Sequence, residues 1–196
     1  MSRLVGVDGC PDGWLCVVAD GRNLDATILP DLDAVLRSFG SDAIITIDVP
    51  IGLTDAGPRS CDLEARRLLK APRASSVFPA PVRPTLSART YLEACTIHAA
   101  ADGRRMSKQA FAILPKIVQV DAVLRGDPSL QRRVREVHPE VCFTVWNADQ
   151  PMLHRKTRSQ GREEREALID KNWPGQRERL ITAGGVDKMA PHGWHT

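Results

Sequence analysis

The sequence has no apolar run long enough to cross a bilayer, since a membrane helix needs about 20 apolar residues. The first strand is predicted to begin directly after the first residues, so we expect neither a signal peptide nor a membrane partner. The five cysteines form no C-x-x-C pair, and an odd number does not fit the disulfide framework of a short secreted chain. We therefore expect reduced thiols and a cytoplasmic location.

Several common site motifs are missing as well. The turn DGCPDG at residues 8–13 matches neither a P-loop nor a dinucleotide-binding fingerprint. Zinc ligands are available in Cys10, Cys61, Cys142 and His138, but their spacing matches no zinc motif, so we do not expect a zinc site. The sequence also has no internal repeat and no low-complexity segment.

The composition is that of a single globular domain spanning residues 1–196. Of the 196 residues, 42% are hydrophobic and 26% are charged, which is enough apolar material for one sizeable core. The net charge of +3 permits a nucleic-acid partner but does not require one. The composition is also compatible with a homodimer.

The first quarter of the chain predicts three strands, a helix and a fourth strand. Two apolar runs flank a Gly/Pro turn and predict a hairpin over residues 3–9 and 14–19, with a third strand over 25–29. Asp31 is placed to cap a helix over residues 33–38. The nearly continuous β-branched run at residues 43–50 predicts a central strand covered on both faces.

The rest of the chain is mainly helical, with an inserted helical segment at about residues 70–130. Ser60 is placed to cap a helix over residues 61–69, and the four prolines within residues 71–84 predict an irregular segment. Further helices are expected over 87–101 and 107–125 (split or kinked at Pro115), 140–145, 161–172 and 175–183. A strand begins at residue 133, and residues 185–196 predict an irregular tail.

Acidic residues follow the two strands expected to lie side by side in the sheet. Asp8 and Asp48 each stand near the end of a strand, and Glu136 and Glu140 flank the end of a later one. Because gathered carboxylates repel one another, such a cluster implies cations, and hard oxygen ligands suit Mg²⁺ or Mn²⁺. The alternative is that Asp8 and Asp48 are turn residues that accept backbone hydrogen bonds.

His138 precedes Pro139 and Glu140, and the three residues have two interpretations. A histidine beside a carboxylate can bind a metal or transfer a proton. Alternatively, His138 caps a helix whose dipole favours Glu140 in the first turn.

Basic and hydroxyl side chains supply candidate contacts to an anionic substrate. Arg73, Ser75 and Ser76 begin a stiff, proline-rich segment that ends at Arg83, and a surface loop pinned by Phe78 is the alternative. Lys116 and Lys156 are the best placed of the basic residues that could neutralise phosphates. The others are Lys108, Arg132, Arg133, Arg135 and Arg155, which are otherwise solvated surface charges.

Six motifs in this order resemble an uncharacterised bacterial and archaeal family of predicted nucleases with a ribonuclease-H-like fold. The motifs are GVDGCPDGW at 6–14, IDVPIGL at 47–53, CDLEAR at 61–66, SSVFP at 75–79, LPKI at 114–117 and EVHPEVCF at 136–143. The resemblance implies an α/β domain with a mixed sheet of three antiparallel strands, a helix and a parallel fourth strand. It makes Asp8 and Asp48 the metal-binding pair, with Glu136, His138 and Glu140 as further site residues.

One departure from the family pattern concerns the end of the chain. The family resemblance leads one to expect further acids on a closing C-terminal helix, but only Asp187 follows Gly184, so this helix is expected to be missing or altered. We hypothesise a metal-dependent nuclease in which Asp8, Asp48 and Glu140 hold Mg²⁺ or Mn²⁺. The alternatives are an ATP-dependent phosphotransferase of the related kinase core, and a non-catalytic module that binds nucleic acid or protein.

Overall fold

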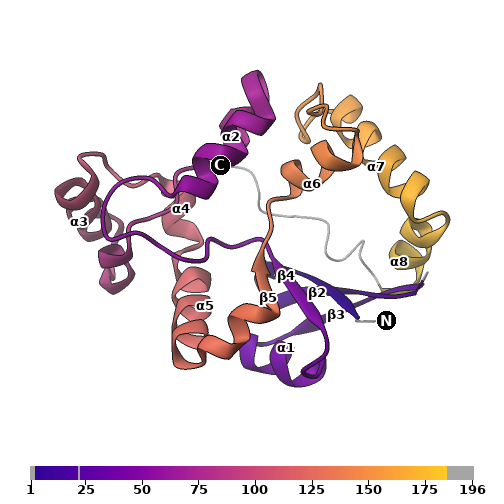
Figure 1. Ribbon diagram of the computed structural model, residues 1–196, viewed down its shortest axis with the longest axis horizontal. Helices are drawn as coiled ribbons and strands as arrows, with labels where there is room; N and C mark the ends of the chain where they lie inside the picture. The colour runs from indigo at the N-terminus through magenta and orange to yellow at the C-terminus, as the bar shows by residue number, and fades with distance from the viewer. Residues whose placement is uncertain (1–2, 22, 185–196) are drawn as a thin grey trace. The chain divides into compact units, whose positions relative to one another are not determined.

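The computed structural model describes residues 3–21 and 23–184 and has an α/β architecture (Figure 1). The chain divides into two compact units, one from the described parts of Met1–Ile45 and His154–Thr196 and the other from Thr46–Leu153. The single-domain expectation stays a prediction. The expected irregular tail, and with it the question of a closing helix, lies outside the described residues.

The first unit begins with an antiparallel meander, as the sequence predicts. Strands β1 (Leu4–Cys10), β2 (Gly13–Asp20) and β3 (Asn23–Leu29) pair in order, with Asp8 opposite Leu15. Gly13 has a φ of +134°, and a Cβ there would lie 2.2 Å from the Leu29 carbonyl oxygen. The tight turn and the close approach of β3 therefore require glycine at this position.

Helix α1 (Leu32–Ser38) follows, and the Asp31 carboxylate caps it by accepting from the Ala34 N–H at 2.7 Å. Late in the chain, α7 (Ser159–Asn172) and α8 (Gln176–Gly184) complete this unit. The Gln176 side chain accepts from the Leu24 N–H at 3.1 Å, which ties α8 to β3. The two charge-rich helices predicted from sequence are thus confirmed, and α7 begins two residues earlier than predicted.

The sheet continues with two more strands in the order β3-β2-β1-β4-β5, and β4 and β5 lie parallel to β1. This is a ribonuclease-H-like topology, as the resemblance implies. Strand β4 (Ile44–Ile47) ends before Asp48, earlier than predicted, because Pro50 cannot continue a ladder. The Val137 N–H donates to the Ile47 carbonyl at 3.0 Å just beyond β5 (Val134–Glu136).

The second unit is mainly helical. Its helices are α2 (Ser60–Arg73), η1 (Ala74–Ser76), η2 (Arg83–Ser87), α3 (Tyr91–Asp102), α4 (Lys108–Ala112), α5 (Leu114–Gly126), η3 (Pro128–Arg132) and α6 (Pro139–Trp146). The break at Ile113 divides the helix predicted over 107–125, as Pro115 indicates. The predicted cap Ser60 is wrong by one residue, since Arg59 precedes α2 and its side chain makes no cap hydrogen bond.

A small core holds the inserted helices together. Ala94, Cys95, Met106, Ala110 and Leu114 are buried against one another, and the aromatic rings of Tyr91 and Phe111 meet edge to face at 5.5 Å. The helical segment within residues 70–130 therefore has an apolar centre of its own. No helix in the described part of the chain is long and apolar enough to cross a membrane.

Candidate functional site

A small pocket in the second unit gathers several predicted site residues at the ends of β4 and β5. Asp48, Glu136 and His138 line it, together with Arg59 and Asp62. Its remaining walls are Val49, Pro50, Val77 and Phe78. The pocket encloses about 30 Å³, which is enough for one water molecule or one small ion.

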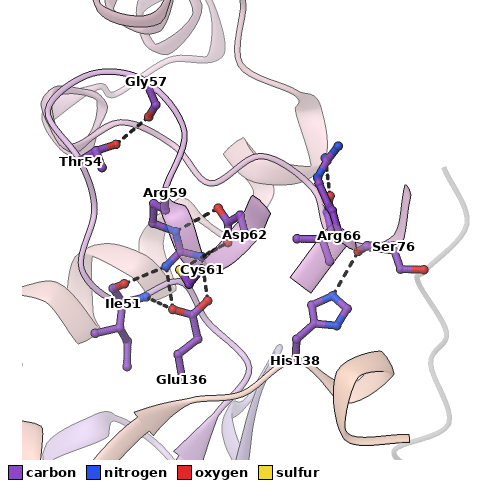
Figure 2. A network of polar contacts seen from close by, with 11 residues as sticks. Ile51, Thr54, Gly57, Arg59, Cys61, Asp62, Arg66, Ser76, Glu136 and His138 are labelled. Atoms are coloured by element: carbon purple, nitrogen blue, oxygen red, sulfur yellow. Dashed lines mark hydrogen bonds and ion pairs between the residues drawn. The ribbon is translucent and has the colours of Figure 1, made fainter. Parts of the chain in front are cut away.

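Arg59 is the centre of this pocket's polar network, which Figure 2 shows. The guanidinium is 5% exposed and uses all five of its N–H donors. It binds the Asp62 carboxylate through Nε and Nη2, the Glu136 carboxylate through Nη1 and Nη2 at 2.6 and 2.8 Å, and the Ile51 carbonyl. This buried cation therefore joins the loop after β4, the start of α2 and the end of β5.

The electrostatics of this network favour a permanently charged arginine. Burial alone acts against the charge on Arg59, but the hydrogen bonds and negative charges of Glu136 and Asp62 outweigh it and raise the pKa of Arg59 above its ordinary value. Two carboxylates face one guanidinium, so the trio keeps a formal charge of −1.

Glu136 has a well-defined partner set. Its carboxylate accepts from Arg59 twice and from the Ile51 N–H at 2.8 Å. These bonds fix the polypeptide that follows Asp48, because Ile51 both donates to Glu136 and accepts from Arg59. The predicted site residue Glu136 thus lies beside Asp48 in a network that we call the Arg59 clamp. The clamp consists of Arg59, Asp62, Glu136 and the Ile51 backbone.

His138 lies at the start of α6, and only one of its two ring nitrogens makes a hydrogen bond. Its Nε2 lies 3.2 Å from the Ser76 carbonyl oxygen, which can only accept, so Nε2 carries the proton. Nδ1 is buried and has no hydrogen-bond partner. A neutral imidazole therefore keeps an unused lone pair, which is costly to bury unless a ligand or a proton donor meets it.

Asp48 and Glu140 frame the same region. Burial, followed by the negative charge of Asp48, raises the pKa of the Cys142 thiol, which places Asp48 close to α6. Glu140, in the first turn of α6, is 7% exposed. The structure therefore brings Asp48, Glu136 and His138 to one pocket and sets Glu140 on the adjoining helix.

The predicted substrate-binding residues of the stiff segment lie at the end of α2. Arg73 is 5% exposed and its Nε has no hydrogen-bond partner. Ser75 donates its hydroxyl to the Pro72 carbonyl at 3.0 Å, and the Ser76 backbone holds His138. Ser76 thus contacts the pocket through its backbone. Lys116 lies in the first turn of α5.

Asp8 and Lys156 belong to the first unit. Asp8 keeps an exposed surface, yet loss of hydration around its carboxyl raises its pKa. The Gly9 backbone N–H and the positive charge of Lys156 act in the opposite direction. The structure therefore brings Asp8 within electrostatic reach of Lys156. The pairing of Asp8 with Asp48 stays a prediction.

Sequence reasoning missed both Arg59 and Asp62 as site residues. Their i, i+3 spacing across the start of α2 was a local signal for an ion pair. The third member, Glu136, lies 77 residues from Arg59 in the sequence, and no local pattern links the two.

The described residues supply only some of the ligands that a metal ion requires. No group of three or more His, Cys, Asp and Glu side chains within residues 3–21 and 23–184 is arranged to hold an ion. Asp48 supplies a carboxylate at this pocket, and His138, which also lines it, has a buried ring nitrogen without a hydrogen-bond partner. This pair of donor types suits Mn²⁺ better than Mg²⁺, which prefers oxygen alone.

Comparison with known proteins gives a family and no closer relative. No curated protein and no solved structure matches the chain. One family model matches residues 6–192, which include every residue of the pocket. The chain therefore belongs to the family described as "Protein of unknown function (DUF429)".

Proposed function

We propose that the chain hydrolyses phosphodiester bonds in nucleic acid with the help of Mg²⁺ or Mn²⁺. The observation that carries the proposal is the pocket at the ends of two neighbouring strands, which is lined by Asp48 and by His138, a residue whose buried Nδ1 has no hydrogen-bond partner. The ribonuclease-H-like topology supports it, because sites in open α/β sheets form beyond the carboxyl ends of the strands.

In this proposal, Asp48 and His138 bind the ion at the pocket, while Asp8 and Glu140, the other residues expected from the sequence, stay predictions to be tested separately. His138 has the arrangement that metal-binding histidines commonly show, since its other ring nitrogen donates to a backbone carbonyl. That hydrogen bond fixes both the tautomer and the direction of the Nδ1 lone pair. A bound divalent ion supplies an activated water and neutralises charge on the leaving oxygen.

The surrounding residues position and protect the reacting groups. The Arg59 clamp holds the backbone next to Asp48 in one conformation, so this carboxylate needs little reorganisation. Its formal charge of −1 also favours a cation in the pocket. We assign Arg73 and Lys116 to substrate phosphates, as charged partners of the anionic backbone.

The test is cleavage of labelled DNA and RNA, including branched forms, with and without Mn²⁺. We expect Mn²⁺-dependent cleavage by the wild type and a loss of at least about 100-fold in Asp48→Asn, the scale seen when one preorganised electrostatic contact to the transition state is removed. Asp55→Asn is the matched control, because Asp55 is an exposed aspartate in the same loop. No cleavage by the wild type, or equal rates in the two variants, contradicts the proposal.

A further inference from the structure

A second, larger cleft lies between α5 and β5 in the same unit, and its volume is about 330 Å³. Figure 1 shows the two elements side by side. Aliphatic side chains form its floor, from Ile51, Val120, Leu124 and Val134. This volume lies at the lower end of the range for small-molecule sites and accommodates a group the size of one nucleotide.

The inner wall of the cleft is polar, and each of its charged side chains has a partner of opposite charge. Arg83 donates to both carboxylate oxygens of Asp121 at 2.7 Å and to the Leu53 carbonyl at 3.2 Å. Glu136, which also lines the cleft, is bound by Arg59. The Arg83–Asp121 pair is neutral, and Glu136 shares the guanidinium of Arg59 with Asp62, so the positively charged groups without a carboxylate partner lie at the rim.

The rim is positive. The Arg125 side chain on α5 is exposed and makes no hydrogen bond or ion pair to any residue of the described chain. The Arg135 side chain on β5 is exposed too, and its one hydrogen bond within the described residues is a long donation to the Arg132 carbonyl at 3.3 Å. Two guanidiniums with unused donors therefore face solvent above an apolar floor, which is a combination suited to an anion with an apolar body.

The cleft adjoins the pocket of Asp48 and His138. Glu136 lines both, and the loop between them contributes Pro50 to the pocket and Ile51 to the cleft. The Ile51–Glu136 hydrogen bond forms the wall that separates them. A chain molecule whose reacting group sits at the pocket can therefore place its next unit in the cleft.

We propose that this cleft binds a single-stranded nucleotide next to the scissile phosphate. Its base rests on the aliphatic floor, and Arg125 and Arg135 bind its phosphate. Arginine suits this role because its fork matches phosphate oxygens and its plane stacks on bases. The inference rests on the proposed function and names the substrate form that the site accepts, an unpaired strand.

The test is binding of a fluorescent single-stranded oligonucleotide, measured by anisotropy over a range of salt concentrations without divalent ions. The one phosphate that the two arginines bind contributes about 0.7 to the slope of log K against log salt for a single strand. We expect Arg125→Ala/Arg135→Ala to weaken binding and to reduce the slope by about that amount. The control Arg37→Ala/Arg89→Ala removes the same charge from exposed sites elsewhere and should change neither.

The role of the floor is tested with an abasic oligomer of equal length and charge. We expect weaker binding than with the intact strand, and equal affinity contradicts the apolar contact. Equal effects of the two arginine pairs, or no effect of either, overturn the cleft as a binding site.

Cleavage assays on the same variants separate this inference from the proposed function. If the wild type cleaves the strand while Arg125→Ala/Arg135→Ala binds it unchanged, the cleft assignment alone is wrong. If binding depends on the two arginines and no cleavage occurs with Mn²⁺, the hydrolytic function is wrong and the cleft stands.

Discussion

At the scale of single residues, Arg59 illustrates how a buried charge becomes tolerable. Desolvating a guanidinium costs several kcal/mol unless every donor is satisfied, and here the five donors meet two carboxylates and a carbonyl. The same bonds fix Ile51 and Glu136 beside the candidate site. Stability and site geometry therefore depend on one side chain.

Removing this side chain should destabilise the chain strongly. Arg59→Leu leaves the Asp62 and Glu136 carboxylates without their cation, and breaking a buried pair on one side costs about 3–5 kcal/mol. The free energy of unfolding from urea denaturation measures the loss. Arg67→Leu on the same helix is the control, because it breaks only the exposed pair with Glu64, which contributes about 0–1 kcal/mol. Similar losses in the two variants contradict the clamp.

The residue scale also shows what a sequence can predict about a site. Asp48 and His138 were predicted as site residues from local patterns, namely the end of a strand and a His-Pro-Glu segment. The structure places both residues at one pocket. The Arg59–Glu136 contact was not predicted, because it joins segments far apart in the chain. A charged residue in isolation does not reveal its partner.

At the scale of elements, α7 is attached through the segment that leads into it. The Glu164 carboxylate accepts from the His154 N–H at 3.1 Å and lies 2.6 Å from its ring Nδ1. Gly161 packs so closely that a Cβ there would lie 2.0 Å from the Arg155 carbonyl oxygen. The first turns of the helix are therefore fixed by contacts with His154 and Arg155 in the segment just before it rather than by a side-chain cap.

This attachment predicts a pH dependence. Burial opposes ionisation of Glu164, but the hydrogen bonds of His154 and the charges of His154 and Arg165 prevail and lower its pKa. Since the folded pKa lies below the unfolded value of about 4.3, the contact stabilises the fold above that pH and is lost as pH falls through the folded pKa. Glu164→Gln should therefore lower the melting temperature at pH 7 by up to about 4 °C and matter less near pH 3.

Melting curves of Glu164→Gln and Glu163→Gln from pH 7 to pH 3 provide the measurement. Glu163 is the adjacent, exposed glutamate, so its variant should follow the wild type at every pH. A difference between wild type and Glu164→Gln that stays constant down to pH 3 would contradict the proposed linkage.

Elements differ in how far the sequence predicts them. The meander and the split at Ile113 follow from local alternation and from Pro115. The first residue of α2 was misplaced because Ser60 looks like a cap, whereas Arg59 precedes the helix and commits its side chain to carboxylates and a carbonyl. The start of α2 was therefore set by tertiary contacts, and a local sequence pattern contains no information about these.

At the scale of the whole molecule, the sheet draws its strands from distant parts of the sequence. Strand β5 joins β4 after the inserted helices, through the Val137 hydrogen bond to Ile47. The family resemblance predicted this topology, and periodicity alone did not, because pairing over such a separation has no local signature. The division into two compact units was not predicted either.

The proposed ion gives a prediction for the stability of the whole chain. A ligand that binds only the native state stabilises it by about 2.7 kcal/mol at 100 times its dissociation constant, which raises the melting temperature by about 5–11 °C for a chain of this size. We expect this shift with Mn²⁺ in the wild type and in the control Asp55→Asn. Asp48→Asn removes a proposed ligand and should abolish the shift, while His138→Gln should reduce it.

This measurement separates metal binding from hydrolysis, because it requires no substrate. A shift that depends on Asp48 and His138 establishes the ion's ligands at the pocket even where no cleavable nucleic acid is known. Asp8→Asn tests the ligand predicted from sequence at the end of β1, and a full shift in that variant removes Asp8 from the set. Equal shifts in the wild type and in Asp48→Asn would show that Mn²⁺ binds elsewhere, and the metal-dependent mechanism at this pocket would then be wrong.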